Sequence, residues 1–222
     1  DYITGNHIPR ELVNGDIELH EALINKHFSL WKNLQTPNSI TGLLNAFSQQ
    51  LNNLGGLSKE SRYEIFEYET RQSKYVTAGQ RAYDFFDLYW ELPLWHLDYV
   101  KFWEEVTTDK KIGRSLFQDA MKTANWGGVW DGSFEQSRII VPSWIHPLRA
   151  LSKVPFVFSK KTWKNFDRRV FAWWIDPIAS YAVANYIDVL RENRGFKSAI
   201  SWHCLHYLKN KGISMQEVES FS

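Results

Sequence analysis

The chain has 222 residues, of which 44% are hydrophobic and 23% charged, so it is long enough to bury a core and too apolar to be mainly disordered. Its 26 Lys and Arg residues nearly balance its 25 Asp and Glu residues, and the formal net charge of +1 argues against nucleic-acid binding by general electrostatics. No repeat, low-complexity tract or linker marks a boundary. We therefore predict a single domain over residues 1–222.

The cysteine and tryptophan content indicates the compartment and the kind of surface that this chain has. Cys204 is the single cysteine and cannot form an internal disulfide, and no apolar run is long enough to span a bilayer. The sequence also shows no apolar leader, and together these features favour a cytoplasmic protein without a membrane span. Eleven Trp residues are many for this length, and their indole donors need partners. We expect part of the surface to face a protein segment, a ligand or a membrane interface.

The first residues differ in pattern from the rest of the chain. Residues 1–9, Asp-Tyr-Ile-Thr-Gly-Asn-His-Ile-Pro, read like the end of a strand that turns into a loop, and such a strand needs neighbours to pair with. No other clear strand pattern follows. We therefore expect a fragment whose N-terminal part lies outside this sequence, with at most a remnant strand here.

Apolar residues at helical spacing then predict one helix after another. Ser58 is the expected N-cap of a long amphipathic helix that runs towards Val76, and Pro177 is a favourable first residue for a helix that ends at Leu190. Lys and Arg residues between positions 160 and 169 form a basic surface. The expected helices cover residues 17–31, 40–54, 58–76, 97–106, 114–122, 142–149, 176–190, 197–209 and 215–220.

The chain is organised around residues 83–103, which carry nine aromatic rings. Aromatic side chains bury large areas, so this density predicts a core segment. Pro93 lacks a backbone donor and biases Leu92 away from helical geometry, which predicts a helix, a kink and a second helix. Glu91 and His96 are polar residues inside this segment and are the first candidates for chemistry.

Other polar motifs have both a chemical and a structural interpretation. His203 and His206 lie within one helical turn of Cys204 and could hold a metal, but no second cluster joins them, and two half-buried histidines on a packed helix are favoured. The Gly127-Gly128 loop lacks the Lys-Ser or Lys-Thr of a Walker phosphate loop, which favours a structural turn. No nucleophile elbow is present. We predict no metal site, and these motifs alone do not name a reaction.

Three runs of the sequence resemble a known family. They are Arg71-Gln72-Ser73-Lys74-Tyr75-Val76, Gln80-Arg81-Ala82-Tyr83-Asp84-Phe85-Phe86 and Glu91-Leu92-Pro93-Leu94-Trp95. In this order they resemble the C-terminal, ATP-using domain of asparagine synthase-like proteins, in which an Arg-bearing helix leads to a Pro-Phe-Leu-Asp or Pro-Leu-Trp-Asp turn. The first six residues resemble the second half of the family's Ser-Gly-x-Gly-x-Asp-Glu-Leu-Phe-Gly-Gly loop. Residues 125–130, 142–149 and 163–169 look like a divergent subgroup found with surface-polysaccharide gene sets.

The resemblance implies a fold and an activity. The chain would be mainly α, as the helical C-terminal part of an α/β adenine nucleotide alpha-hydrolase-like (PP-loop ATPase) domain. In such enzymes a pyrophosphate loop and Mg²⁺ orient ATP, a substrate carboxylate attacks the α-phosphorus, and ammonia opens the acyl-adenylate to an amide with release of AMP and pyrophosphate. The loop and the metal neutralise the departing pyrophosphate. The implied partners are ATP, a small-molecule carboxylate and a glutaminase domain or subunit, but no nucleic acid.

The resemblance also implies site residues. Asp1 matches the acidic position of the family's loop, and Arg81 matches the Arg before the turn, so both are expected to bind nucleotide or pyrophosphate. The expected wall of the nucleotide and substrate cleft consists of Arg71, Gln72, Glu91, Pro93, Trp95 and His96.

Several positions depart from the family pattern. His96 stands where the family has Asp, Glu91 replaces an Arg, and Tyr89 replaces a Glu. The pyrophosphate loop, the glutaminase domain and the family's pyrophosphate-binding Lys have no counterpart in this sequence, so we expect this chain alone to be inactive. The alternative hypothesis is a helical, Trp-rich protein-interaction module or a degenerate, non-catalytic family member.

Overall fold

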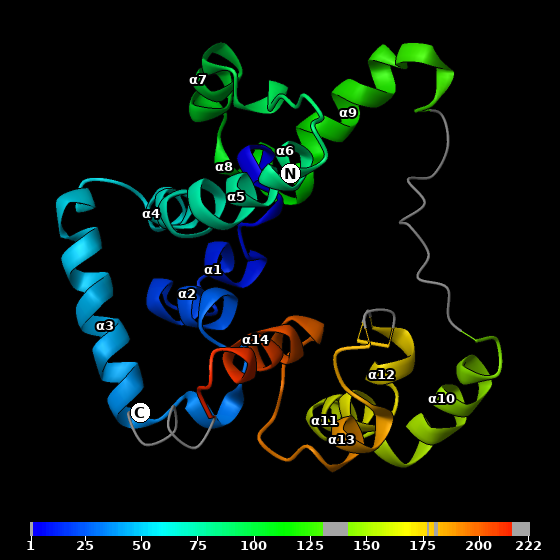
Figure 1. Ribbon diagram of the computed structural model, residues 1–222. Helices are drawn as coiled ribbons and strands as arrows, with labels where there is room; N and C mark the ends of the chain where they lie inside the picture. The colour runs from blue at the N-terminus through cyan, green and yellow to red at the C-terminus, as the bar shows by residue number, and fades with distance from the viewer. Residues whose placement is uncertain (1, 131–141, 177, 180–181, 215–222) are drawn as a thin grey trace. The chain divides into compact units, whose positions relative to one another are not determined.

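The computed structural model describes residues 2–130, 142–176, 178–179 and 182–214, and these residues are mainly helical (Figure 1). Within these ranges no strand is present, and Trp31 and Phe196 form an isolated antiparallel bridge. The chain divides into two compact units, which are Asp1–Leu23 with Ala46–Phe134, and Ile24–Asn45 with Glu135–Ser222. A single domain over residues 1–222 stays a prediction. None of the described helices is long and apolar enough to cross a membrane.

The first unit is built from short helices and turns. Two longer helices, α2 (Leu19–His27) and α3 (Pro37–Leu51), contribute residues to both units. The helices that lie wholly in the first unit are α1 (Arg10–Asn14), α4 (Lys59–Glu67), α5 (Thr77–Gly79), α6 (Arg81–Phe85), α7 (Leu97–Glu105), α8 (Thr108–Lys111) and α9 (Ser115–Ala124).

Aromatic and aliphatic side chains from separate elements form the core of the first unit. Leu12 and Tyr63 are completely buried, and Phe66 and Trp103 nearly so. The ring of Phe47 on α3 packs edge-on against that of Phe66 on α4, with centroids 5.2 Å apart. This core holds α4 in place, and α4 leads into the segment that carries the candidate site.

The predicted helix after Ser58 is confirmed, with one change in its geometry. The Ser58 hydroxyl accepts a hydrogen bond from the backbone N–H of Ser61 at 3.1 Å and caps α4, as predicted. The helix continues through Tyr68–Val76 as a π-helix and then into α5, and in Figure 1 α4 and α5 follow one another along one run of ribbon. Because a π-helix bonds residues five apart, it shifts which side chains share a face, and such segments often occur at functional sites.

The N-terminal residues do not form the expected strand end. Tyr2–Asn6 is a single π-helical turn in which Gly5 has a φ of +83°. The Tyr2 hydroxyl donates to the carbonyl oxygen of Glu64 at 2.7 Å, and Thr4 and Gly5 are buried. Contacts with α4 and α8 therefore set this turn, whereas the strand prediction considered only the local pattern.

The second unit consists of α10 (Ile145–Lys153), α11 (Lys160–Val170), α12 (Ala172–Ile175), α13 (Tyr186–Arg191) and α14 (Ala199–Asn210), with the ends of α2 and α3 that belong to it. Its core includes Trp31, Ile178, Val189, Phe196 and Trp202. The three aromatic rings of this core have centroids 5.5 to 6.4 Å apart. The Trp31 indole donates to the carbonyl oxygen of Ser201 at 3.2 Å, so its polar edge is satisfied inside the core.

The predicted helix over residues 176–190 is wrong for most of the residues that the structure describes there. Among its described residues only the end is helical, as α13, and the Asn185 side chain caps this helix by accepting from the N–H of Asp188 at 2.9 Å. The Trp173 indole N–H donates a hydrogen bond to the carbonyl oxygen of Ala184 at 2.9 Å. Asp176 has an extended backbone, and its carboxylate accepts a hydrogen bond from the N–H of Ala199. These longer-range bonds replace helical ones. Pro177 lies outside the described residues, as does the helix predicted over 215–220.

The aromatic segment 83–103 is not the core segment that its composition predicts. Trp103 is buried, but Phe85 and Tyr89 are 84% and 86% exposed. Pro93 does interrupt the helix, as predicted, because it begins a 3₁₀ turn, Pro93–Trp95, after a non-helical Leu92. The helical parts, α6 and α7, are too short for one continuous buried face, and so most of these rings lie at the surface.

Candidate functional site

A cavity of about 930 Å³ lies in the first unit, and its wall combines charged and aromatic side chains. The volume is in the range of small-molecule sites. Three of the six residues expected in the cleft wall, Arg71, Gln72 and Trp95, line it. Gln72 lies in the helical stretch before the aromatic segment 83–103 and Trp95 lies inside that segment, and the fold brings the two side chains to one cavity.

The Glu67 carboxylate binds three residues that line the cavity. It is completely buried, and its Oε1 lies 2.7 Å from His7 Nδ1 and accepts from Gln72 Nε2 at 2.9 Å and from Arg71 Nη1 at 3.2 Å. Arg71 and Gln72 follow Glu67 by four and five residues, and the π-helix allows both to reach one oxygen. A buried carboxylate needs such partners. The hydrogen bonds to Glu67 in turn hold the side chains of Arg71 and Gln72 in position beside the cavity.

An ion pair between Lys111 and Glu64 forms another part of the cavity wall. Lys111 Nζ lies 2.7 Å from Glu64 Oε2, and the side chain of Lys111 is only 6% exposed. Burial raises the pKa of Glu64 above its usual value, although the hydrogen bond and charge of Lys111 act in the opposite direction. Burial and the nearby Glu64 carboxylate likewise raise the pKa of Tyr2, which also lines the cavity.

Aromatic rings complete the cavity. The rings of Tyr68 and Trp95 have centroids 5.4 Å apart, and the ring of Tyr2 lies 6.3 Å from that of Tyr68. Leu57, Ile65 and Val100 add apolar surface. The cavity can therefore hold a molecule that has both an apolar or planar part and charged groups.

The other predicted site residues do not line this cavity. Arg81 has a side chain that is 78% exposed and lies 3.4 Å from the Asp84 carboxylate. Glu91 accepts from the hydroxyl of its neighbour Tyr89 at 2.6 Å, and exposed His96 has its Nδ1 3.7 Å from an Asp98 oxygen.

Two further predicted site residues remain. Pro93 shapes the turn that places Trp95, but it does not itself contribute to the cavity wall. Asp1 lies outside the described residues.

Sequence reasoning missed the residues that balance the charges of the cavity. Glu64, Lys111 and His7 all contribute to the wall. Glu67 and Arg71 stand four residues apart with opposite charge, which is a signal of a helical pair that the sequence does offer. Lys111 is 47 residues from Glu64, and no local spacing indicates that pairing.

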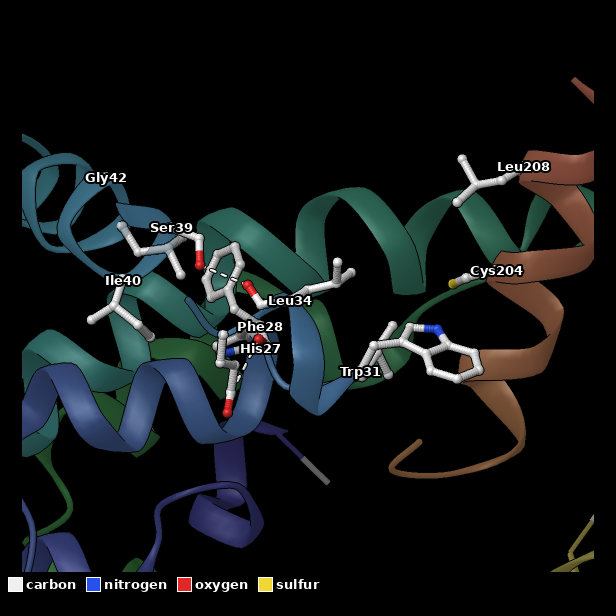
Figure 2. A pocket seen from close by; sticks show the side chains of 12 residues that line it. His27, Phe28, Trp31, Leu34, Ser39, Ile40, Gly42, Cys204 and Leu208 are labelled. Atoms are coloured by element: carbon white, nitrogen blue, oxygen red, sulfur yellow. Dashed lines mark hydrogen bonds between the residues drawn. The ribbon is translucent and has the colours of Figure 1, made fainter. Parts of the chain in front are cut away.

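A second, more apolar pocket of about 510 Å³ lies in the second unit (Figure 2). Figure 2 shows the side chains of Phe28 and Leu34 on one side and those of Cys204 and Leu208 of α14 on the other, with the Trp31 ring next to Cys204. Burial raises the pKa of the Cys204 thiol, which lowers the fraction of reactive thiolate. None of the described residues in its wall is Lys, Arg, Asp or Glu, so this pocket is less suited to acid–base or ionic chemistry than the first cavity.

The structure does not assemble a metal site from the histidines next to Cys204. His203 is half-buried and His206 is exposed on α14. Among the described residues, no group of three or more His, Cys, Asp or Glu side chains is placed to hold a metal ion.

The cavity of the first unit is thus the best candidate site, with Arg71, Gln72 and Trp95 in its wall and two carboxylates held by specific partners. Comparison with known proteins adds no family to this description. No protein-family model matches the chain, and no curated protein or solved structure matches it either.

Proposed function

We propose that this chain supplies the carboxylate-binding cleft of an asparagine synthase-like, ATP-dependent ligase that forms an amide and releases AMP and pyrophosphate. The observation that carries the proposal is the position of Arg71, Gln72 and Trp95. The family resemblance assigns these residues to a cleft wall, and all three line one cavity of suitable volume. The origin of the helices in an adenine nucleotide alpha-hydrolase-like domain belongs to the same proposal.

Arg71 is the residue of this cavity best suited to bind a substrate carboxylate. Its guanidinium has five donors, and among the described residues one of its nitrogens, Nη1, bonds to Glu67. Charge-assisted pairs of a guanidinium with a carboxylate are among the stronger hydrogen bonds in proteins. Lys111 is less available because Glu64 already neutralises it.

The charges of the cavity favour an amino acid over a simple carboxylate. Glu104 lines the cavity together with Arg71, and the charges of Glu64 and Lys111, which also line it, offset one another. A ligand with an ammonium group and a carboxylate can face Glu104 and Arg71 at once, whereas a dicarboxylate without an ammonium group meets repulsion from Glu104. Aspartate is the simplest substrate with this chemistry.

ATP and Mg²⁺ enter the proposal through the family resemblance. The rings of Tyr68 and Trp95 fit a planar base. The described residues offer no group of acidic side chains for Mg²⁺, and Arg81, expected at the phosphates, lies outside the cavity wall. We therefore assign to these residues only the binding and orientation of the carboxylate and the exclusion of water by the aromatic wall.

Calorimetric titration of the chain with aspartate, in the presence of ATP and Mg²⁺, tests the proposal. Replacing Arg71 by alanine should weaken aspartate binding by about 10- to 100-fold, because it removes a charge-assisted hydrogen bond. Arg191→Ala, an exposed arginine at the end of α13, is the control and should bind as the unaltered chain does. Succinate, which lacks the ammonium group, should bind at least about tenfold more weakly than aspartate. Equal binding of both ligands, or no effect of Arg71→Ala, would contradict the proposal.

A protein-interaction module is the second candidate, and the exposed aromatic segment favours it. Phe85, Phe86 and Tyr89 present large apolar area at the surface. In the asparagine synthase-like family the partner would be a glutaminase domain or subunit. Loss of glutaminase binding in a Phe85→Ser/Tyr89→Ser variant, with aspartate binding unchanged, would support this second role beside the first.

A further inference from the structure

Helices α10 and α11 of the second unit form a hairpin with a well-defined inner side. Arg149 on α10 and Asp167 on α11 form two hydrogen bonds, from Nε at 2.6 Å and from Nη2 at 2.7 Å. The rings of Phe156, Trp163 and Phe166 pack against one another with centroids 5.0 to 6.0 Å apart. These contacts hold α10 and α11 together on either side of the connection between them.

The connection presents apolar side chains to the solvent. We call residues 153–164 the hairpin tip. Phe158 is fully exposed, and Val154 and Val157 are 65% and 67% exposed. Exposing three neighbouring apolar side chains to water costs free energy, and a partner surface that covers them removes this cost.

The same tip is strongly basic. Lys153, Lys160, Lys161 and Lys164 are exposed, and the sequence has no acidic residue between Arg149 and Asp167. The formal charge of the whole chain is only +1, so this concentration of positive charge is local. Lysines around protruding apolar side chains complement a surface that is anionic outside and apolar beneath.

We propose that the hairpin tip binds the surface of an anionic lipid membrane. Phe158 and Val157 enter the boundary between headgroups and acyl chains, and the four lysines of the tip face the anionic headgroups. This is the arrangement by which amphipathic elements lie at membrane interfaces. Each basic residue near such a surface strengthens binding, and the effect is screened by salt.

The exposure of Phe158 favours a lipid surface over an acidic protein. A side chain that projects completely into solvent needs a matching pocket in a protein partner, whereas a fluid lipid boundary accommodates it without one. The proposal is independent of the aspartate site, because no residue of the tip belongs to the cavity of the first unit.

Sedimentation of the full chain with vesicles tests the proposal. Vesicles of phosphatidylcholine and phosphatidylserine should bind the chain, and vesicles of phosphatidylcholine alone should bind it much less. Lys160→Gln/Lys161→Gln should weaken binding to the anionic vesicles by about 10- to 30-fold, since each lysine contributes separately. Raising the salt concentration should reduce the difference between this variant and the unaltered chain.

Matched controls separate the tip from general effects of charge and hydrophobicity. Lys209→Gln/Lys211→Gln removes the same charge at the end of α14, and Phe85→Ser removes an exposed ring in α6. Both should bind vesicles as the unaltered chain does, whereas Phe158→Ser should bind about tenfold more weakly. Circular dichroism verifies that each variant is folded.

Three results would overturn the proposal. They are no binding to the anionic vesicles, equal losses in the tip variants and their controls, and retention of the chain on an acidic polypeptide without binding to vesicles. The last result would assign the tip to an acidic protein partner instead.

Discussion

Replacing Lys111 by methionine should lower the free energy of unfolding by about 3 kcal/mol at pH 7, because it leaves Glu64 without its partner inside the first unit. The side chain of Lys111 is buried and its ammonium lies 2.7 Å from the carboxylate, so solvent screens the pair little. Chemical denaturation measured from about pH 4 to pH 8 gives the free energies.

The pH dependence of this effect follows from the raised pKa of Glu64. In the folded chain Glu64 holds its proton to a higher pH than in the unfolded chain, so its contribution to stability is largest below the unfolded pKa and falls as pH rises through the folded pKa. Removing Lys111 raises that pKa further. The cost of Lys111→Met should therefore be small near pH 4 and grow towards neutral pH.

The double variant Glu64→Gln/Lys111→Met provides the control. It removes both charges, so it should recover most of the lost stability and show no growth of the cost with pH. If the double variant were less stable than Lys111→Met alone at pH 7, the account of an uncompensated Glu64 charge would be wrong.

Replacing Gly5 by alanine should cost about 3 kcal/mol or more. Gly5 has a φ of +83°, and an added Cβ would lie 2.6 Å from the Cβ and the carbonyl oxygen of Lys111. The left-handed backbone alone costs about 1 kcal/mol for alanine, and the clash with backbone atoms adds the cost of moving α8. Thermal and denaturant unfolding of the variant measure the total.

Gly15→Ala is the matched control for this variant. Gly15 has a similar φ of +81°, but the nearest atom to its added Cβ is the end of the Lys59 side chain at 3.9 Å. This variant should therefore show only the backbone cost of about 1 kcal/mol. Equal losses for Gly5→Ala and Gly15→Ala would mean that the turn of Tyr2–Asn6 does not pack tightly against Lys111.

Local signals in the sequence predicted much of the helical architecture. Ser58 caps α4 because a hydroxyl at that position reaches the N–H of Ser61, which depends only on neighbouring residues. The helix from 197 to 209 agrees closely with α14, whose apolar side packs Trp202 into the core. Pro93 breaks the helix through its own ring geometry.

Long-range contacts decided the elements that the sequence did not predict. The stretch before α13 has small residues that suit a helix. However, the Trp173 indole donates a hydrogen bond to the carbonyl oxygen of Ala184, and Ala182 has a φ of +50°, which is not helical. The aromatic segment around Tyr89 suggested a core, because composition shows how much area a residue can bury but not whether another element covers it. Both cases depend on residues distant in the sequence.

The candidate site likewise combines residues that the sequence indicated with residues that only long-range contacts reveal. The family resemblance placed Arg71, Gln72 and Trp95 at a cleft, and the structure brings them to one cavity wall. It did not indicate Glu64 and Lys111, whose pairing joins α4 to α8 across 47 residues. Burial and spatial pairing, which determine the charge balance of the cavity, appear only once the helices are packed.

The most direct test of the central claim is to map ligand binding by nuclear magnetic resonance. The ligand is a non-hydrolysable aspartyl-adenylate analogue, which presents the carboxylate-derived and planar parts together and resembles the intermediate of the proposed reaction. We predict that it shifts the resonances of the Trp95 indole N–H and the Gln72 side-chain amide, and leaves those of the buried Trp31 and Trp202 indoles unchanged. An unchanged Trp95 resonance at saturating ligand, or shifts confined to Trp31 and Trp202, would contradict the proposal that the cavity of the first unit binds the substrate.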